Sequence, residues 1–158
     1  MCTDQFEARR DQAVIRLGTR TPACSTPACN ETDPLALTGR VPDLRCYECD
    51  RLARGKPWVE QQHPAGQHNH SATVPIPGND HRVVDSLKHD WPRDTLRNAD
   101  SSPLLIAAAC LRGWLDTLQL IIERTVGWIP TFLEALHAWL LDRLGAGWWH
   151  ELTWAVPL

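Results

Sequence analysis

The chain has 158 residues, a formal net charge of −3 at pH 7 and a sequence pI of about 6.1. This length suits one domain with an appendage. The acidic balance argues against a protein that binds nucleic acid through bulk positive charge, although local contacts are compatible with it. Charged residues stand where the apolar part of a signal peptide would lie, so we expect a cytoplasmic protein with reduced cysteines.

Residues 1–22 are expected to form an N-terminal segment. Within this segment, residues 4–17 have the spacing of a short amphipathic helix with few apolar positions. Residues 18–27 contain Gly, Pro, Ser and Thr, a composition that predicts a loop.

Two cysteine pairs come next. Cys24 and Cys29 enclose four residues, Cys46 and Cys49 enclose two, and sixteen residues separate the pairs. This spacing is typical of a zinc site, and four thiolates complete a closed tetrahedral shell that is structural. The segment has few large apolar residues, so zinc would supply folding energy. The alternatives are ordinary thiols, or two disulfides in an oxidising compartment.

Residues 58–85 hold four of the seven histidines. Residues 58–63 have the pattern of a strand, 64–66 of a turn, and 73–76 of a returning strand. Pro77 and Gly78 are expected to break the second strand, and Asn79 or Asp80 to cap a helix that begins near His81. The order of elements is therefore a β-hairpin followed by a helix.

This hairpin and helix, with His63 on the first strand, Asn69 in the loop and His81 on the helix, resembles the HNH nuclease motif of the His-Me finger group. The resemblance covers about a fifth of the chain. It implies hydrolysis of phosphodiester bonds with one divalent ion, such as Mg²⁺. His63 would be the general base, Asn69 would hold it in orientation, and His81 would bind the ion.

The chain departs from the motif in two places. Gln62 stands where the family has a metal-binding Asp or His, and a neutral amide is a poorer ligand for a divalent ion. Asp85 is a candidate replacement, because it lies one helical turn after His81 on the same face. The cysteine pair that holds the helix in many family members is absent, since Pro77 and Asp80 occupy its positions.

Three basic residues are candidates for contact with nucleic acid. Arg54 and Lys56 belong to a local run of positive charge just before the hairpin, and Arg82 follows His81. By the same resemblance, Arg54 or Arg82 would contact phosphate. An ordinary solvated charged surface explains the run equally well.

Residues 101–158 differ in composition, with six of the eight tryptophans lying between Trp114 and Trp154. A helix is expected from Ser101, a break at 127–130, and a second helix over 131–144. The polar stripe is narrower than the apolar face, so we expect both helices to bury more than one side. The uncharged stretch 101–111 is too short to predict a membrane span.

Together these features predict an α+β protein. Residues 23–100 would form a zinc-braced, HNH-like ββα module, and 101–158 a tryptophan-rich α-helical hairpin. The expected function is metal-dependent cleavage of nucleic acid, with DNA favoured over RNA. The alternative is a non-catalytic, zinc-stabilised interaction protein. The apolar helices predict a homodimer, and a membrane surface is the less favoured partner.

Overall fold

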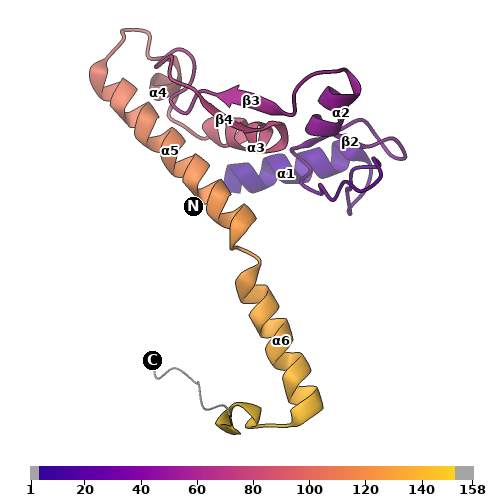
Figure 1. The fold of residues 1–158 in the computed structure, drawn as a ribbon. Helices are drawn as coiled ribbons and strands as arrows, with labels where there is room; N and C mark the ends of the chain where they lie inside the picture. The colour runs from indigo at the N-terminus through magenta and orange to yellow at the C-terminus, as the bar shows by residue number, and fades with distance from the viewer. Residues whose placement is uncertain (1–3, 152–158) are drawn as a thin grey trace. The chain divides into compact units, whose positions relative to one another are not determined.

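The computed structural model describes residues 4–151 and divides into two compact units, Met1–Leu120 and Ile121–Leu158, each considered by itself. Helices dominate the described chain, and its strands form two antiparallel sheets of two strands each (Figure 1). The protein is therefore a mixed helix and strand fold, as predicted. Trp154 lies outside the described residues.

Helix α1 (Asp4–Leu17) confirms the predicted N-terminal helix. Its buried side chains are Phe6, Ala13 and Leu17, so one face packs inward. Arg9 donates from two nitrogens to the two carboxylate oxygens of Asp90, at 2.7 and 2.9 Å. The N-terminal segment is thus part of the first unit's core.

Residues 24–49, which we call the four-cysteine segment, contain two short paired strands, β1 (Leu37–Thr38) and β2 (Arg45–Cys46). Leu37 pairs with Cys46, and α2 (Tyr47–Ala53) begins directly after β2. The turn between the strands needs Gly39, whose φ is +88° and whose Cβ would lie 2.6 Å from the Asp43 carbonyl oxygen. The small core of this segment consists of Leu17, Cys24, Leu37, Leu44 and Cys46.

Strands β3 (Val59–Gln62) and β4 (Val74–Pro77) form the second antiparallel pair, and α3 (Gly78–Lys88) follows at once. The predicted hairpin and helix are confirmed in this order, and we call them the ββα module. Two details of the prediction are wrong. Pro77 pairs with Val59 rather than breaking the strand, and the helix begins at Gly78, three residues before His81.

The prediction that Asn79 or Asp80 caps α3 is also wrong, because the N-cap is Pro77 and no side chain caps the helix. Asn79 instead joins α3 to the four-cysteine segment. Its backbone N–H donates to Glu48 Oε1 at 3.1 Å, and its Oδ1 accepts from the Glu48 N–H at 3.0 Å. Its Nδ2 donates to Glu31 Oε2 at 3.0 Å. These bonds hold the start of α3 to the four-cysteine segment.

A short helix, α4 (Arg93–Arg97), lies where only a connecting loop was expected. The left-handed Asn98, with φ of +38°, ends it. Helix α5 (Pro103–Thr125) begins near the predicted residue. In the first unit it turns a face of small residues toward the ββα module, with Ala109, Gly113 and Thr117 buried. Small side chains at a spacing of four allow this close approach.

Leu120 is also buried, but most other large apolar side chains of α5 are exposed, with Leu104 81% exposed, Leu111 67% and Leu115 66%. Within the described chain, the contact of α5 with the first unit uses these small residues and Leu120, and most of its other large side chains stay uncovered. The prediction that both helices bury more than one side includes burial against a second copy of the chain, and it stays a prediction. Helix α6 (Ile129–Leu144) contains no buried residue.

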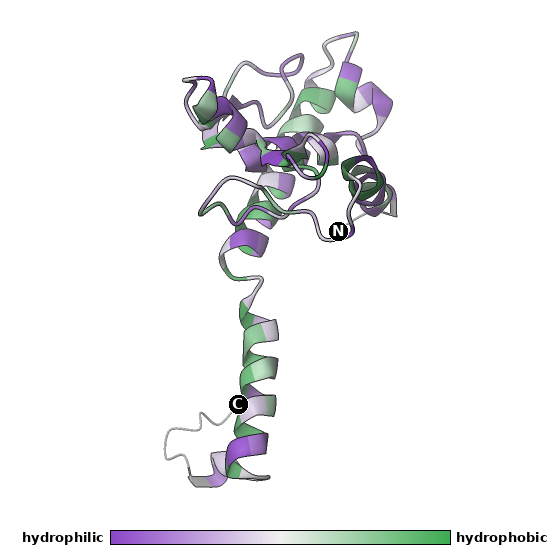
Figure 2. Ribbon diagram, turned by 90° about the vertical axis from the view of Figure 1, so that its right-hand side faces the viewer, coloured by the Kyte–Doolittle hydropathy of each residue, from purple (hydrophilic) through white to green (hydrophobic). Residues whose placement is uncertain are grey.

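Residues 126–128 separate α5 from α6, so the chain breaks close to the predicted residues 127–130. Pro130 lies in the first turn of α6, and the 3-10 helix η1 (Trp148–Glu151) follows Gly145 to Gly147. Figure 2 shows that hydrophobic residues occupy most turns of α6. The predicted antiparallel hairpin stays a prediction.

The stretch Pro103–Leu144 is long and apolar enough to cross a membrane, by length and composition alone. Its most apolar window of 18 residues has a mean hydropathy of 1.5, and 22% of that window is buried. The uncharged stretch 101–111 is too short to span a membrane by itself, and the longer apolar stretch includes charged residues such as Arg112 and Asp116. A single such stretch is weak evidence for a span, so the cytoplasmic location stays a prediction.

Candidate metal centre and active site

The four cysteines of the four-cysteine segment come together, with all four Sγ atoms within 4.8 Å of one another. Cys29 Sγ and Cys46 Sγ lie 3.7 Å apart. A tetrahedral ion with sulfur ligands at about 2.3 Å places its sulfurs about 3.8 Å apart. This four-cysteine cluster can therefore hold a metal ion such as zinc. Among the described residues, it is the only group of three or more His, Cys, Asp or Glu side chains placed so that they could hold one metal ion.

Backbone N–H groups support the sulfurs. The Cys46 N–H donates to Cys24 Sγ at 3.2 Å, and the Cys49 N–H donates to Cys46 Sγ at 3.3 Å. Burial raises the pKa of the Cys24 thiol, but hydrogen bonds from Thr26 and the Cys46 N–H outweigh it and lower that pKa to about 6. Burial raises the pKa of the Cys46 thiol to about 12. A bound cation would favour the thiolate at all four positions.

The residues named by the resemblance carry buried polar atoms without hydrogen-bond partners. Gln62 is fully buried, and neither its Nε2 nor its Oε1 has a partner. The Nδ1 atoms of His63 and His81 are also buried and have no hydrogen-bond partner, although two carboxylates lie near the His81 atom. Only one other atom in the described chain, on Trp148, shares this state. Unpaired buried polar groups are rare in folded proteins and need an explanation such as water, an ion or a catalytic role.

Two carboxylates lie near His81. Its Nδ1 is 3.5 Å from Asp85 Oδ2, the residue predicted from helical spacing, and 3.5 Å from Glu60 Oε2. Burial lowers the pKa of His81, although the nearby Asp85 and Glu60 act in the opposite direction. The neutral imidazole that this favours is the form that binds metal.

Both carboxylates already have cationic partners. Lys88 Nζ lies 2.9 Å from Asp85 Oδ1 and also donates to the His63 carbonyl oxygen at 2.8 Å. Arg51 Nη1 lies 2.5 Å from Glu60 Oε1. An ion bound between His81 and Asp85 would have to share that carboxylate with the Lys88 ammonium group.

Asn69 is buried and ties the loop that follows His63. Its Nδ2 donates to the carbonyl oxygens of Ala65 at 3.0 Å and Thr95 at 2.9 Å. Its Oδ1 accepts from Asn98 Nδ2 at 2.9 Å. The loop is thereby fixed to α4 as well as to its own turn.

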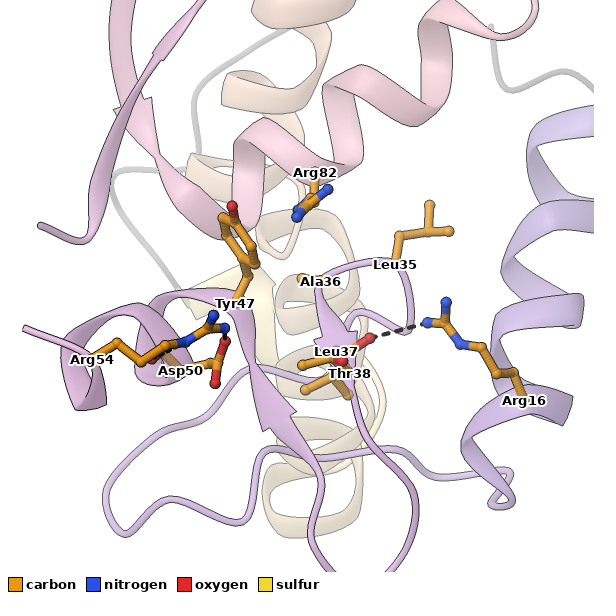
Figure 3. A pocket seen from close by; sticks show the side chains of 9 residues that line it. All are labelled: Arg16, Leu35, Ala36, Leu37, Thr38, Tyr47, Asp50, Arg54 and Arg82. Atoms are coloured by element: carbon orange, nitrogen blue, oxygen red, sulfur yellow. Dashed lines mark hydrogen bonds and ion pairs between the residues drawn. The ribbon is translucent and has the colours of Figure 1, made fainter. Parts of the chain in front are cut away.

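The predicted nucleic-acid contacts divide into two groups. Arg54 and Arg82 line the same pocket, which Figure 3 shows, whereas Lys56 is exposed and lies outside it. His68 and His70, the other loop histidines, are exposed.

Sequence reasoning missed several residues of these sites, among them Glu60, Lys88 and Asn79. One signal could have found Glu60, since it lies two residues before Gln62 and strand alternation puts both on one face. No sequence signal pairs Lys88 with the His63 carbonyl, because that contact depends on how α3 packs against the hairpin. No family model, no curated protein and no solved structure matches this chain.

Proposed function

We propose that the protein is an HNH-like, metal-dependent phosphodiester hydrolase acting on nucleic acid, with DNA favoured. One observation carries the proposal. Four of the five unpaired buried polar atoms in the described chain belong to Gln62, His63 and His81, the residues that the resemblance assigns to base and metal binding. Buried donors and acceptors without hydrogen-bond partners in the protein are suited to binding water, an ion or a reacting group.

Each residue has a role in this proposal. His63 accepts a proton from the attacking water, and Asn69 fixes the loop that orients it. His81, with Asp85 and the Gln62 amide oxygen, holds a divalent ion such as Mg²⁺. When bound, such an ion neutralises charge that grows on the phosphate oxygens.

Zinc in the four-cysteine cluster is structural in this proposal. Four thiolates fill the tetrahedral shell and leave no position for substrate. The ion would fix the four-cysteine segment, and its ligand Cys46 is the N-cap of α2. Because Glu48 of α2 binds Asn79 of α3, the zinc would indirectly set the position of the helix that carries His81.

A plasmid-nicking assay with added Mg²⁺ tests the activity. The wild-type protein is expected to nick the plasmid and His63→Ala to abolish nicking, since it removes the base. His68→Ala is the matched control, because His68 is an exposed histidine of the same loop. Unchanged nicking by His63→Ala, or equal loss in both variants, would refute the mechanism. Circular dichroism and zinc content verify that each variant folds.

The second candidate is a non-catalytic interaction protein on the same zinc-stabilised scaffold. It is favoured by the pairing of Asp85 with Lys88 and of Glu60 with Arg51, which satisfies both carboxylates without an ion. The exposed apolar side chains of α5 and α6 would then bind a partner, with a second copy of the chain as the expected one. A zinc-loaded protein that neither nicks DNA nor binds Mg²⁺ would favour this function.

A further inference from the structure

A pocket of about 320 Å³ lies in the first unit, where α1, β1, α2 and α3 meet. Figure 3 shows three arginines around it, each from a different part of the chain. Arg16 lies in the last turn of α1, Arg54 is the C-cap of α2, and Arg82 lies in α3. Pockets for small ligands begin at about 300 Å³, so the space suits a phosphate with a small attached group.

The charge around this arginine pocket is unbalanced. Asp50 is its one acidic lining residue, and it pairs with Arg54. In the described part of the chain, neither Arg16 nor Arg82 forms an ion pair with a carboxylate. Two positive charges therefore stand at the pocket without a counter-charge, which favours an anion.

Contacts hold the arginines in place while leaving donors for a ligand. Arg16 Nη2 donates to the Leu37 carbonyl oxygen at 3.1 Å, which uses one of its five N–H donors. The Arg82 guanidinium carbon lies 4.0 Å from the centre of the Tyr47 ring. Stacking of this kind fixes the guanidinium plane, and an ordered planar fork matches the oxygens of a phosphate group.

We infer that the arginine pocket binds a phosphate group through Arg16 and Arg82, with Arg54 assisting. The phosphate can belong to a nucleic-acid backbone or to a small phosphomonoester. The guanidinium groups can make the same hydrogen bonds to a backbone phosphate and to a phosphomonoester. Thr38, which carries a hydroxyl, also lines the pocket.

The arginine pocket adjoins the proposed active site. If the phosphate belongs to a nucleic-acid backbone, the inference rests on the proposed function. Arg82 lies over the ring of Tyr47, and the hydroxyl of the same tyrosine donates to Glu60 Oε1 at 3.4 Å. Glu60 Oε2 in turn lies 3.5 Å from His81 Nδ1. A backbone phosphate held at Arg82 would therefore place a neighbouring part of the strand near His81.

Binding by the full chain is measured without added divalent ion, so that cleavage plays no part. Fluorescence anisotropy gives the Kd for a short labelled DNA duplex, and calorimetry gives one Kd for inorganic phosphate and one for a nucleoside monophosphate. The variants are Arg16→Gln and Arg82→Gln. Arg93→Gln is the matched control, because Arg93 is an exposed arginine outside the pocket. Arg82→Lys keeps the charge and removes the planar fork.

Arg16→Gln and Arg82→Gln are each expected to weaken phosphate binding about tenfold or more, as loss of a charge-assisted hydrogen bond predicts. Arg82→Lys should fall between Arg82→Gln and wild type, and Arg93→Gln should match wild type. For DNA, Arg16→Gln and Arg82→Gln should each also reduce the salt slope by about one, whereas Arg82→Lys keeps the charge and should leave that slope unchanged. Unchanged zinc content and circular dichroism confirm that the variants fold.

The outcomes separate this inference from the proposed function. Arginine-dependent binding of DNA assigns the pocket to the nucleic-acid backbone, and the same dependence for the monophosphate alone assigns it to a small ligand. Both results uphold the pocket even if nicking fails. Wild-type protein that binds none of the three probes, or pocket variants that bind like wild type, would overturn the inference even if nicking succeeds.

Discussion

At Gly113, α5 packs directly against the backbone of the ββα module. A Cβ atom added to Gly113 would overlap the carbonyl oxygen and carbon of Pro64 and would lie 3.0 Å from its Cα. All three atoms are backbone, so no flexible side chain can move aside. Gly113→Ala must therefore shift α5 away from the loop that follows His63.

Two effects of opposite sign determine the result. Replacing glycine by alanine inside a helix stabilises it by about 1 kcal/mol. Overpacking costs about 1–3 kcal/mol, and rigid backbone on the opposing side places Gly113→Ala at the upper end, about 3 kcal/mol. The expected net loss is thus about 2 kcal/mol in the free energy of unfolding, or about 4–8 °C in Tm for a chain of this length.

Thermal and urea unfolding followed by circular dichroism measure this change. Ala107→Gly is the matched control, because Ala107 is an exposed position of the same helix. It is expected to lose about 1 kcal/mol from propensity alone. A Gly113→Ala protein that is more stable than wild type would show that propensity dominates, and would refute the close packing of α5 on Pro64.

The other predictions concern the four-cysteine cluster, the active site, the start of α3 and the assembly. Cys46→Ser or Cys49→Ser is expected to lower zinc content, measured by atomic absorption, and to unfold the four-cysteine segment; full stability without metal would contradict a structural zinc. His81→Ala should weaken nicking through metal affinity, so excess Mg²⁺ should partly restore it, whereas His63→Ala should stay inactive at any Mg²⁺ concentration. Asn79→Ala should lose about 2 kcal/mol of stability in urea unfolding, because the part-buried Glu48 N–H of α2 and the Glu31 carboxylate both lose a hydrogen bond; a loss below about 0.5 kcal/mol would count against the link between α2 and α3. Size-exclusion chromatography with light scattering should show a dimer, which we expect to form through the apolar helices. A monomer near 17.8 kDa that does not bind liposomes would exclude both the dimer and the membrane.

Features that depend on local pattern could be predicted from the sequence. The cysteine spacing was sufficient to predict the four-cysteine cluster, because each short pair brings two sulfurs together whatever surrounds it. The residue pattern of the strands and turn predicted the hairpin and the helix after it, although Pro77 belongs to the strand, and helical spacing placed Asp85 beside His81. The break near 127–130 also follows from local chemistry, namely glycine and proline within an otherwise apolar helix.

Contacts between residues far apart in the sequence depend on how the helices and strands pack. No local sequence pattern predicts them. Asn79 looked like a helix cap from its position, but Glu48 and Glu31 approach it from the four-cysteine segment and take its hydrogen bonds. The arginine pocket joins residues 16, 54 and 82, which no local spacing connects. Likewise, α5 has apolar residues on several faces, and a periodicity argument cannot choose among them. Contact with the Pro64 backbone selects the face of small residues, because only that face can approach closely enough.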